Sequence, residues 1–174
     1  MAQNVSVKIK GETPLLVDKY IAKSTRPQPR MKSRPIDIPV EDMLYKNGNG
    51  YFLPSRNLLF CLRDGGKRVI ERGRTTYAKT IMGGVAVEPL EITLQPQEYE
   101  TYIRAVKRSN GERIEKTSPQ FNNWSLEFRL IVSDWLSIDD VKRVLEVAGQ
   151  MDGLGAFRIG GFGRFTVEKF EAVS

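Results

Sequence analysis

A short segment near the end of the chain, residues 153–167, combines five glycines with Arg158 and Arg164 and continues into a strand-like stretch. Glycine adopts positive φ angles and, because it lacks a side chain, allows a phosphate or another backbone to approach the main chain closely. Two guanidinium groups in such a segment predict a platform for a polyanion, since arginine recognises phosphate well. The alternative is a glycine-rich turn that only reverses the chain.

The available residue types limit the chemistry of the protein. The chain contains no histidine and a single cysteine, Cys61. The commonest general base and metal ligand is therefore missing, and a zinc site or an internal disulfide has no set of partners. Cys61 lies in an apolar run, so we expect a buried and unreactive thiol. We expect no cofactor, no bound metal and no catalytic residue.

The charge is positive and unevenly distributed. The formal net charge is +6 and the isoelectric point is about 9.5. Basic residues concentrate in residues 19–34, 67–79 and 104–116, whereas residues 127–152 are more acidic. Positive charge gathered in loops and hairpins is typical of proteins that bind a phosphate backbone. The alternative is that these stretches are solvated basic loops.

Length and hydropathy predict one domain over residues 1–174. No apolar run approaches the ~20 residues needed to cross a bilayer. The first residues lack the apolar core of a signal peptide. We therefore expect a cytoplasmic protein with no membrane partner.

Alternation of apolar and polar residues predicts several β-strands. Pro89 lies within one of them and marks a strand edge or a bulge, because proline has no N–H to donate to a neighbouring strand. The predicted strands cover residues 5–17, 85–94, 124–132 and 164–170.

Two predicted segments carry much of the positive charge. Residues 18–39 combine several prolines with many charges and predict a long, exposed basic loop after the first strand. Residues 102–117 carry Asn110-Gly111 between two extended arms, which is the pattern of a β-hairpin, because both residues accept positive φ.

Helical spacing of apolar residues appears twice. Ser55 is a predicted N-cap for a helix that continues to about residue 63. Ser137 and Asp140 have the spacing of a capping box before an amphipathic helix that ends near Gly149. Residues 75–82 predict a short additional helical piece.

With the hairpin set aside, the order of elements is β-α-β-β-α-β, a ferredoxin-like, RRM-like α+β fold. In this topology four antiparallel strands form one sheet with two helices on one face. The other face stays free, and RNA-recognition modules use it to bind RNA.

Three segments, in this order, make the chain similar to the CRISPR-associated RAMP superfamily, in particular to its guide-RNA-coating backbone subunits. Residues 13–17 resemble the end of the family's first strand, and residues 153–167 resemble its C-terminal glycine-rich loop. Residues 52–63 resemble its I-P-G-S-S-L-K-G-x-L-R helix entry, although the glycine after proline is absent and Arg56-Asn57 replaces Ser-Leu.

The resemblance implies a fold that holds single-stranded RNA through backbone contacts. In the family's backbone subunits, copies stack along the guide and a protruding hairpin kinks the bases, a part that residues 102–117 would take. The chain is short for such a subunit, which fits a lone version from a phage or mobile element. Some relatives cut target RNA with an aspartate after the first strand. Asp18 and Asp37 lie in that region, and the alternative is that they form salt bridges within a loop.

We therefore expect a non-catalytic subunit that binds single-stranded RNA, with single-stranded DNA as the alternative, and that self-associates along the strand. Two other functions stay open: a structural or assembly protein, for example a phage component, and a metal-dependent endoribonuclease on the same fold. The expected contacts are basic side chains that bind phosphates and glycines that allow close approach. They are Lys8, Lys23, Arg26, Arg30, Arg56, Arg63, Lys107, Arg108, Arg158, Gly160, Gly161, Gly163 and Arg164.

Overall fold

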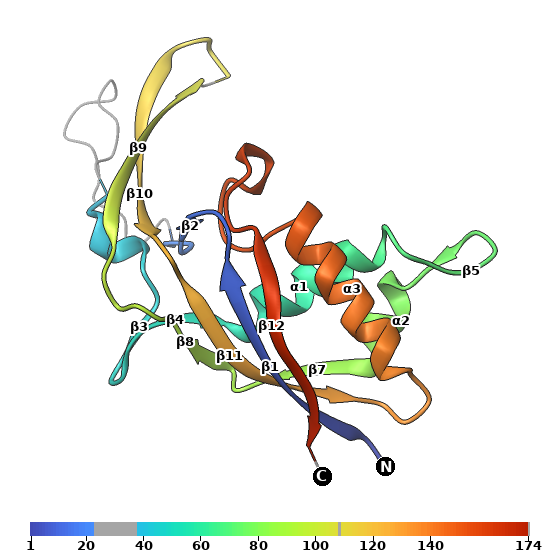
Figure 1. The fold of residues 1–174 in the computed structure, drawn as a ribbon. Coiled ribbons are helices and arrows are strands. Elements are labelled where there is room, and N and C mark those ends of the chain that lie inside the picture. The colour runs from blue at the N-terminus through green and yellow to red at the C-terminus, as the bar shows by residue number, and fades with distance from the viewer. Residues whose placement is uncertain (23–37, 108, 174) are drawn as a thin grey trace.

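The computed structural model describes residues 1–22, 38–107 and 109–173, which form an α+β fold around a four-stranded antiparallel sheet. The strand order is β12-β1-β11-β7, so the first and last strands of the chain pair with each other (Figure 1). The strands of this main sheet are β1 (Gln3–Gly11), β7 (Val85–Glu88), β11 (Ser125–Val132) and β12 (Phe165–Val173).

The alternation predicted for the first strand is confirmed in β1. Val5 stands opposite Leu130 and Val7 opposite Phe128, and all four side chains are buried on one face of the sheet. The residues between them point to the other face and are partly or fully exposed. Burial of this apolar face is the main driving force for forming the sheet.

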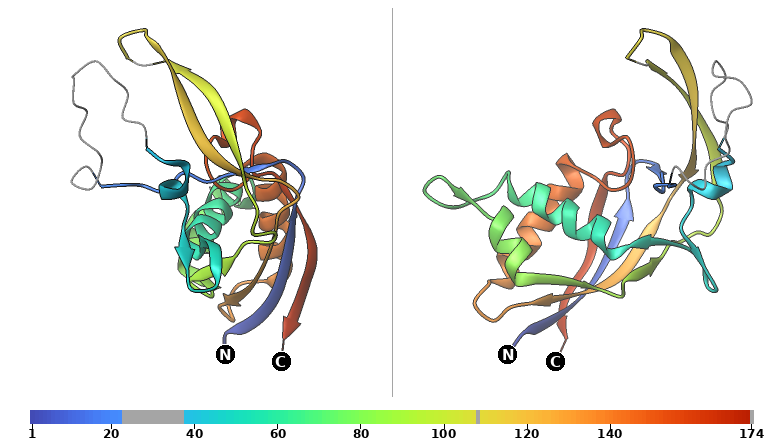
Figure 2. Two further views of the ribbon diagram at one scale, coloured as in Figure 1. Left: turned by 90° about the vertical axis from the view of Figure 1, so that its left-hand side faces the viewer. Right: turned by 180° about the vertical axis from the view of Figure 1, so that it is seen from behind.

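Three α-helices of the described residues lie on one face of the main sheet, and these residues leave the opposite face uncovered (Figure 2, left). The helices are α1 (Ser55–Gly66), α2 (Ala78–Gly84) and α3 (Ile138–Met151). Gly65 allows α1 to approach α3, because a Cβ at this position would lie 2.6 Å from the Cβ of Ala148.

The predicted hairpin is confirmed and is longer than residues 102–117. Its arms belong to a second sheet of order β2-β10-β9 and extend beyond the helices and the main sheet (Figures 1 and 2). The short strand β2 joins this sheet to the end of β1. The strands are β2 (Leu15–Leu16), β9 (Glu100–Lys107) and β10 (Arg113–Phe121).

The strand predicted over residues 85–94 is divided between two sheets. Its first half is β7 of the main sheet, and its second half, β8 (Glu91–Thr93), pairs with β4 (Gly50–Pro54) instead. The change of sheet occurs at Pro89, which cannot donate a ladder hydrogen bond. The remaining small elements are β3 (Lys46–Asn47), β5 (Ile70–Arg72), β6 (Thr75–Thr76) and the 3-10 helices η2 (Val40–Met43) and η3 (Arg158–Gly160).

Both predicted helices are present, but the predicted capping by serine side chains is wrong. Ser55 is the first residue of α1, and Pro54 takes the N-cap position. The backbone N–H of Ser55 donates to the carbonyl of Leu90 at 2.8 Å, which fixes this residue in the helix. Ser137 does take the N-cap position of α3, as predicted, yet its hydroxyl makes no capping hydrogen bond within the described residues.

The buried Trp124 fixes the end of β1 and the start of β12 relative to each other. Its indole Nε1 donates to the carbonyl of Thr13 at 2.8 Å, and its ring packs edge-on against Phe165 at 6.2 Å between centroids. Gly11 lies against the same indole, and a Cβ there would be 2.2 Å from Nε1. The end of β1 and the start of β12 are therefore held at one aromatic contact.

Replacing Gly65 with alanine tests the close contact between α1 and α3. We expect Gly65→Ala to lower the free energy of unfolding by about 1–3 kcal/mol, because overpacking a buried contact forces the two helices apart. Urea denaturation followed by circular dichroism measures the change. The matched control is Gly83→Ala in α2, where a Cβ would meet no described atom within 4 Å. This control is expected to be neutral or stabilising, and equal destabilisation by both substitutions would contradict the packing argument.

Candidate nucleic-acid interface

The glycine-rich loop between α3 and β12 is joined by main-chain hydrogen bonds to the segment after β1. The N–H of Gly163 donates to the carbonyl of Pro14 at 2.8 Å, and the N–H of Ala156 donates to the carbonyl of Leu16 at 2.7 Å. Within the loop, the N–H of Leu154 donates to the carbonyl of Gly163 at 2.9 Å. Two segments from opposite ends of the sequence therefore form one unit.

The side chain of Thr13 closes this unit. Its hydroxyl donates to the carbonyl of Gly161 at 2.7 Å and accepts the backbone N–H of Arg164 at 2.9 Å. The backbone of Glu12 adds a further bond, because its N–H donates to the carbonyl of Arg164 at 2.8 Å. The start of β12 is thus fixed by the end of β1.

The glycines of the loop mainly allow the chain to approach itself. Gly163 has a φ of 74°, and a Cβ there would lie 1.9 Å from the carbonyl oxygen of Leu154. A Cβ at Gly160 would lie 2.4 Å from the ring of Phe157. Gly161, with a φ of 85°, would meet no described atom within 4 Å. Of the three glycines predicted to admit a ligand, Gly161 has the open space to do so.

Arg158 of the loop contacts α1 through Asp64. Its Nη1 lies 3.3 Å from Oδ2 of Asp64, and the same carboxylate accepts from Arg63 at 2.9 Å and from Lys67 at 2.7 Å. Partial burial acts to raise the pKa of Asp64, but the hydrogen bonds from Lys67 and Arg63 outweigh it and hold this pKa below its usual value. Three cations therefore share one ionised carboxylate.

Arg56 and Arg63 lie along the same side of α1, on either side of Phe60. Their guanidinium carbons are 4.9 and 4.8 Å from the centre of the Phe60 ring. Such cation–π contacts orient the guanidinium groups without neutralising them. The fold thus places Arg56 and Arg63 around Phe60, and Arg158 beside Arg63 through Asp64.

The hairpin contacts the loop through a cluster that the sequence analysis missed. The guanidinium carbon of Arg104 lies 4.0 Å from the centre of the Phe157 ring, and Tyr102 packs on Phe162 at 5.1 Å between centroids. Phe157 and Phe162 are themselves 5.8 Å apart. Nε and Nη1 of Arg104 are buried and find no hydrogen-bond partner among the described residues. Alternation in the hairpin places Tyr102 and Arg104 on one face, but no sequence signal identified the partner.

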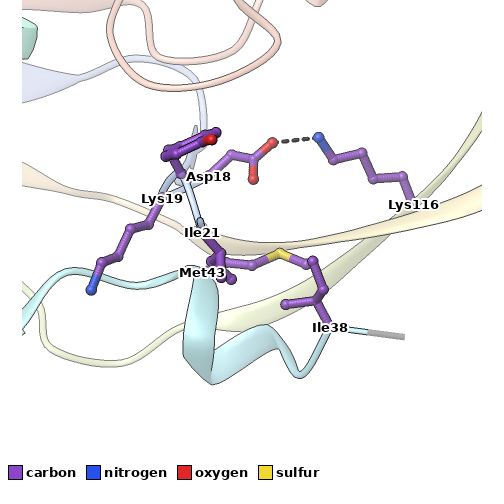
Figure 3. A pocket seen from close by; sticks show the side chains of 7 residues that line it. Asp18, Lys19, Ile21, Ile38, Met43 and Lys116 are labelled. Carbon is purple, nitrogen blue, oxygen red and sulfur yellow. Dashed lines mark hydrogen bonds and ion pairs between the residues drawn. The ribbon is translucent and has the colours of Figure 1, made fainter. Parts of the chain in front are cut away.

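Two small hollows lie beside the segment after β2: one is shared with the glycine-rich loop and α1, the other with η2 and the hairpin. One encloses ≈ 90 Å³, and its lining includes Asp18, Asn57 and Gly155, so each of the three family-like segments contributes to it or adjoins it. The other, of ≈ 370 Å³, has Met43 on one side and an ion pair between Asp18 and Lys116 on another (Figure 3). Asp18 therefore forms a salt bridge, which was one of the two roles considered for it.

The remaining predicted residues are distributed differently. Lys8 lies on the uncovered face of the main sheet, where Glu127 and Glu168 approach its Nζ to 3.7 and 3.6 Å. Lys107 is exposed at the end of β9. Arg164 is half-buried, and its Nη1 has no hydrogen-bond partner among the described residues. The predicted residues Lys23, Arg26, Arg30, Arg108 and Asp37 lie outside the described residues.

The uncovered sheet face is balanced in charge. Besides the contacts of Lys8, Lys10 lies 4.0 Å from Glu168 and Arg129 pairs with Glu88. Each of these cations already has a carboxylate beside it, which reduces its attraction for phosphate. The cations of α1, the loop and the hairpin, rather than this face, therefore form the candidate interface.

The described residues contain no group of three or more His, Cys, Asp or Glu side chains that could hold a metal ion. They also contain no helix long and apolar enough to span a membrane. The predicted burial of Cys61 is confirmed. Its Sγ donates to the carbonyl of Gly153 at 3.1 Å, and burial raises its pKa to about 12.

The raised pKa of Cys61 predicts a thiol that does not react in the folded protein. Compared with the ordinary value of 9.0, a pKa of about 12 lowers the thiolate fraction near pH 8 by about 1000-fold. We expect an aromatic disulfide reagent to label the folded protein at least about 100-fold more slowly than the urea-unfolded protein. Similar labelling rates in the two states would contradict the buried position of the sulfur.

Comparisons with known proteins give a likeness of fold. No protein-family model and no curated protein matches the chain. Among solved structures, it resembles a chain in the cryo-EM structure of the type III-B Cmr-beta bound to cognate target RNA, with a TM-score of 0.65 and 12% sequence identity. The match covers 99% of this chain but 61% of that chain. This distant likeness is one of fold: the chain shares the α+β fold of that structure.

Proposed function

We propose that this protein is a non-catalytic RNA-binding subunit that holds single-stranded RNA by its phosphates. The observation that carries the proposal is that the glycine-rich loop contacts both α1 and the hairpin, and that all three carry basic side chains. The glycine-rich loop is bonded to the end of β1, linked to α1 through Asp64, and packed on the hairpin through Phe157. A phosphate backbone that crosses this surface meets cations from all three segments, which is how sequence-tolerant binders hold a single strand.

The order of elements supports assignment to the RAMP superfamily. β1, α1, β7, β11, α3 and β12 follow one another as β-α-β-β-α-β, and the sheet order β12-β1-β11-β7 is the one that a ferredoxin-like fold requires. On this assignment the chain is one domain, and the hairpin and α2 are additions to the core. The solved structure that it resembles contains target RNA, which favours RNA over single-stranded DNA as the ligand.

The proposed contacts are cations of two kinds. Some are exposed, and others form an ion pair with a carboxylate that an RNA phosphate can replace. Arg63 and Arg158 both contact Asp64. When RNA binds, these two guanidinium groups stay in place and contact phosphates instead of the Asp64 carboxylate. Arg56 and Lys107 are exposed and extend the surface at either end. The glycine-rich loop adds Arg164 and the backbone around Gly161. Association of several copies along one strand follows if each copy covers a short stretch of RNA.

RNA binding is tested by fluorescence anisotropy with labelled single-stranded RNA, DNA of equal sequence and a duplex, over a range of salt concentrations. We expect tight binding to RNA that weakens steeply with salt, because binding releases counterions. The triple variant Arg56→Gln, Lys107→Gln and Arg158→Gln removes three proposed contacts. It should reduce the slope of log K against log salt by about 2, since each contact with a single strand contributes about 0.7.

The matched control removes the same charge from the uncovered sheet face with Lys8→Gln, Lys10→Gln and Arg129→Gln. These cations already have carboxylate neighbours, so we expect a much smaller change in slope. An equal reduction of the salt slope in both triple variants would mean that net charge alone governs binding, and it would overturn the proposed surface. Circular dichroism verifies that both variants are folded.

The ribonuclease alternative rests on Asp18 or Asp37. Asp37 lies outside the described residues, and the carboxylate of Asp18 is paired with Lys116 of β10. This pair supports a structural role for Asp18. We expect labelled RNA to stay intact during long incubation with the protein and magnesium, both for the wild type and for Asp18→Asn. Cleavage by the wild type that is lost in Asp18→Asn would establish a metal-dependent endoribonuclease instead.

A further inference from the structure

The tip of the glycine-rich loop presents apolar side chains to solvent. Ile159 is fully exposed (100%), and Phe157 is 43% exposed. Single exposed apolar residues are common, but these two lie one residue apart on a loop that is bonded to the core on both sides. We therefore infer that the exposure of these two side chains has a function.

The loop holds this tip in a defined conformation. Phe157 has a φ of 52°, in the left-handed region that a bulky residue rarely adopts. The N–H of Gly160 donates to the carbonyl of Phe157, and that of Gly161 donates to the carbonyl of Arg158, both at 2.9 Å. Strain of this kind in a well-bonded segment is a frequent feature of sites that contact ligands.

An aromatic support lies behind the tip. The ring of Phe157 stacks on the guanidinium group of Arg104 at 4.0 Å and packs against Phe162 at 5.8 Å. Phe162 in turn packs against Tyr102 of the hairpin at 5.1 Å. Ile159 therefore projects from a support that joins the loop to the hairpin, rather than from a free end.

The charge around the tip selects the kind of molecule that it contacts. Residues 153–164 contain two arginines and no acidic residue, and Arg104 adds a third cation from the hairpin. The tip is apolar and is surrounded by cations, so a complementary partner has apolar faces next to negative charges. The bases and phosphates of a single-stranded nucleic acid have this combination.

We propose that Ile159 is a wedge that enters between two neighbouring bases of the bound RNA and unstacks them, with Phe157 as the platform for one of them. The inference rests on the proposed RNA binding and adds a base-contacting element to a site described so far by its phosphate contacts. Apolar side chains from other nucleic-acid-binding proteins separate base steps in this way.

The test uses short single-stranded RNAs in which 2-aminopurine, a base whose fluorescence rises when it is unstacked, occupies each position in turn. With wild-type protein at saturation, we expect a rise of at least about threefold at one or two positions, where a base step is opened. Ile159→Ser should remove this rise while lowering affinity by less than about tenfold, because the phosphate contacts stay. Ile159→Leu should retain it.

The matched control is Leu90→Ser, which removes another exposed apolar side chain (78%) from the connection between β7 and β8. It should leave the fluorescence rise unchanged. If RNA binds in the anisotropy assay but no position brightens, or if Ile159→Ser brightens like the wild type, the wedge is overturned and the RNA-binding proposal stands. If no RNA binds, both proposals fall. If Ile159→Ser abolishes self-association in the absence of RNA, Ile159 contacts protein and the wedge is overturned.

Discussion

The structure depends on the bonding of the glycine-rich loop to the segment after β1. Gly163 donates to Pro14, Ala156 donates to Leu16, and Thr13 bridges Gly161 and Arg164. Gly155 lets the loop approach the main chain of Leu16 more closely than a Cβ would allow, and Gly163 lets the two sides of the loop approach each other in the same way. Every cation of the candidate interface is positioned by this unit or by an element that contacts it.

Acidic residues decide which cations are available for RNA. On the uncovered sheet face, Glu127 and Glu168 approach Lys8, so the face expected from RNA-recognition modules is balanced in charge. At α1, in contrast, the single carboxylate of Asp64 serves three cations, which leaves an excess of positive charge. Asp64, which hydrogen bonds from Lys67 and Arg63 keep ionised, also contacts Arg158. The same carboxylate thus organises the cations that a phosphate would contact.

Local patterns predicted most elements, and failures occurred where distant contacts intervened. The alternation in β1, the Asn110-Gly111 turn and the apolar stripe of α3 are local signals, and each predicted element is present. Pro89 marked a break in a strand, but the transfer of the second half to another sheet depends on pairing with β4. The capping role of Ser55 failed because the extended Pro54 takes the N-cap position and Ser55 is already the first helical residue.

The sequence alone determined the α+β class, the hairpin, the burial of Cys61 and the basic character of three segments, because composition and period act over short stretches. Only the tertiary structure decided which charges remain available, since an ion pair such as Asp18–Lys116 joins residues that no local pattern relates. It also decided the role of the loop glycines, since Gly153, Gly155 and Gly163 admit this chain's own backbone. Arg104 on Phe157 became visible only when the fold placed the hairpin on the loop, because a cation–π contact depends on distance in space.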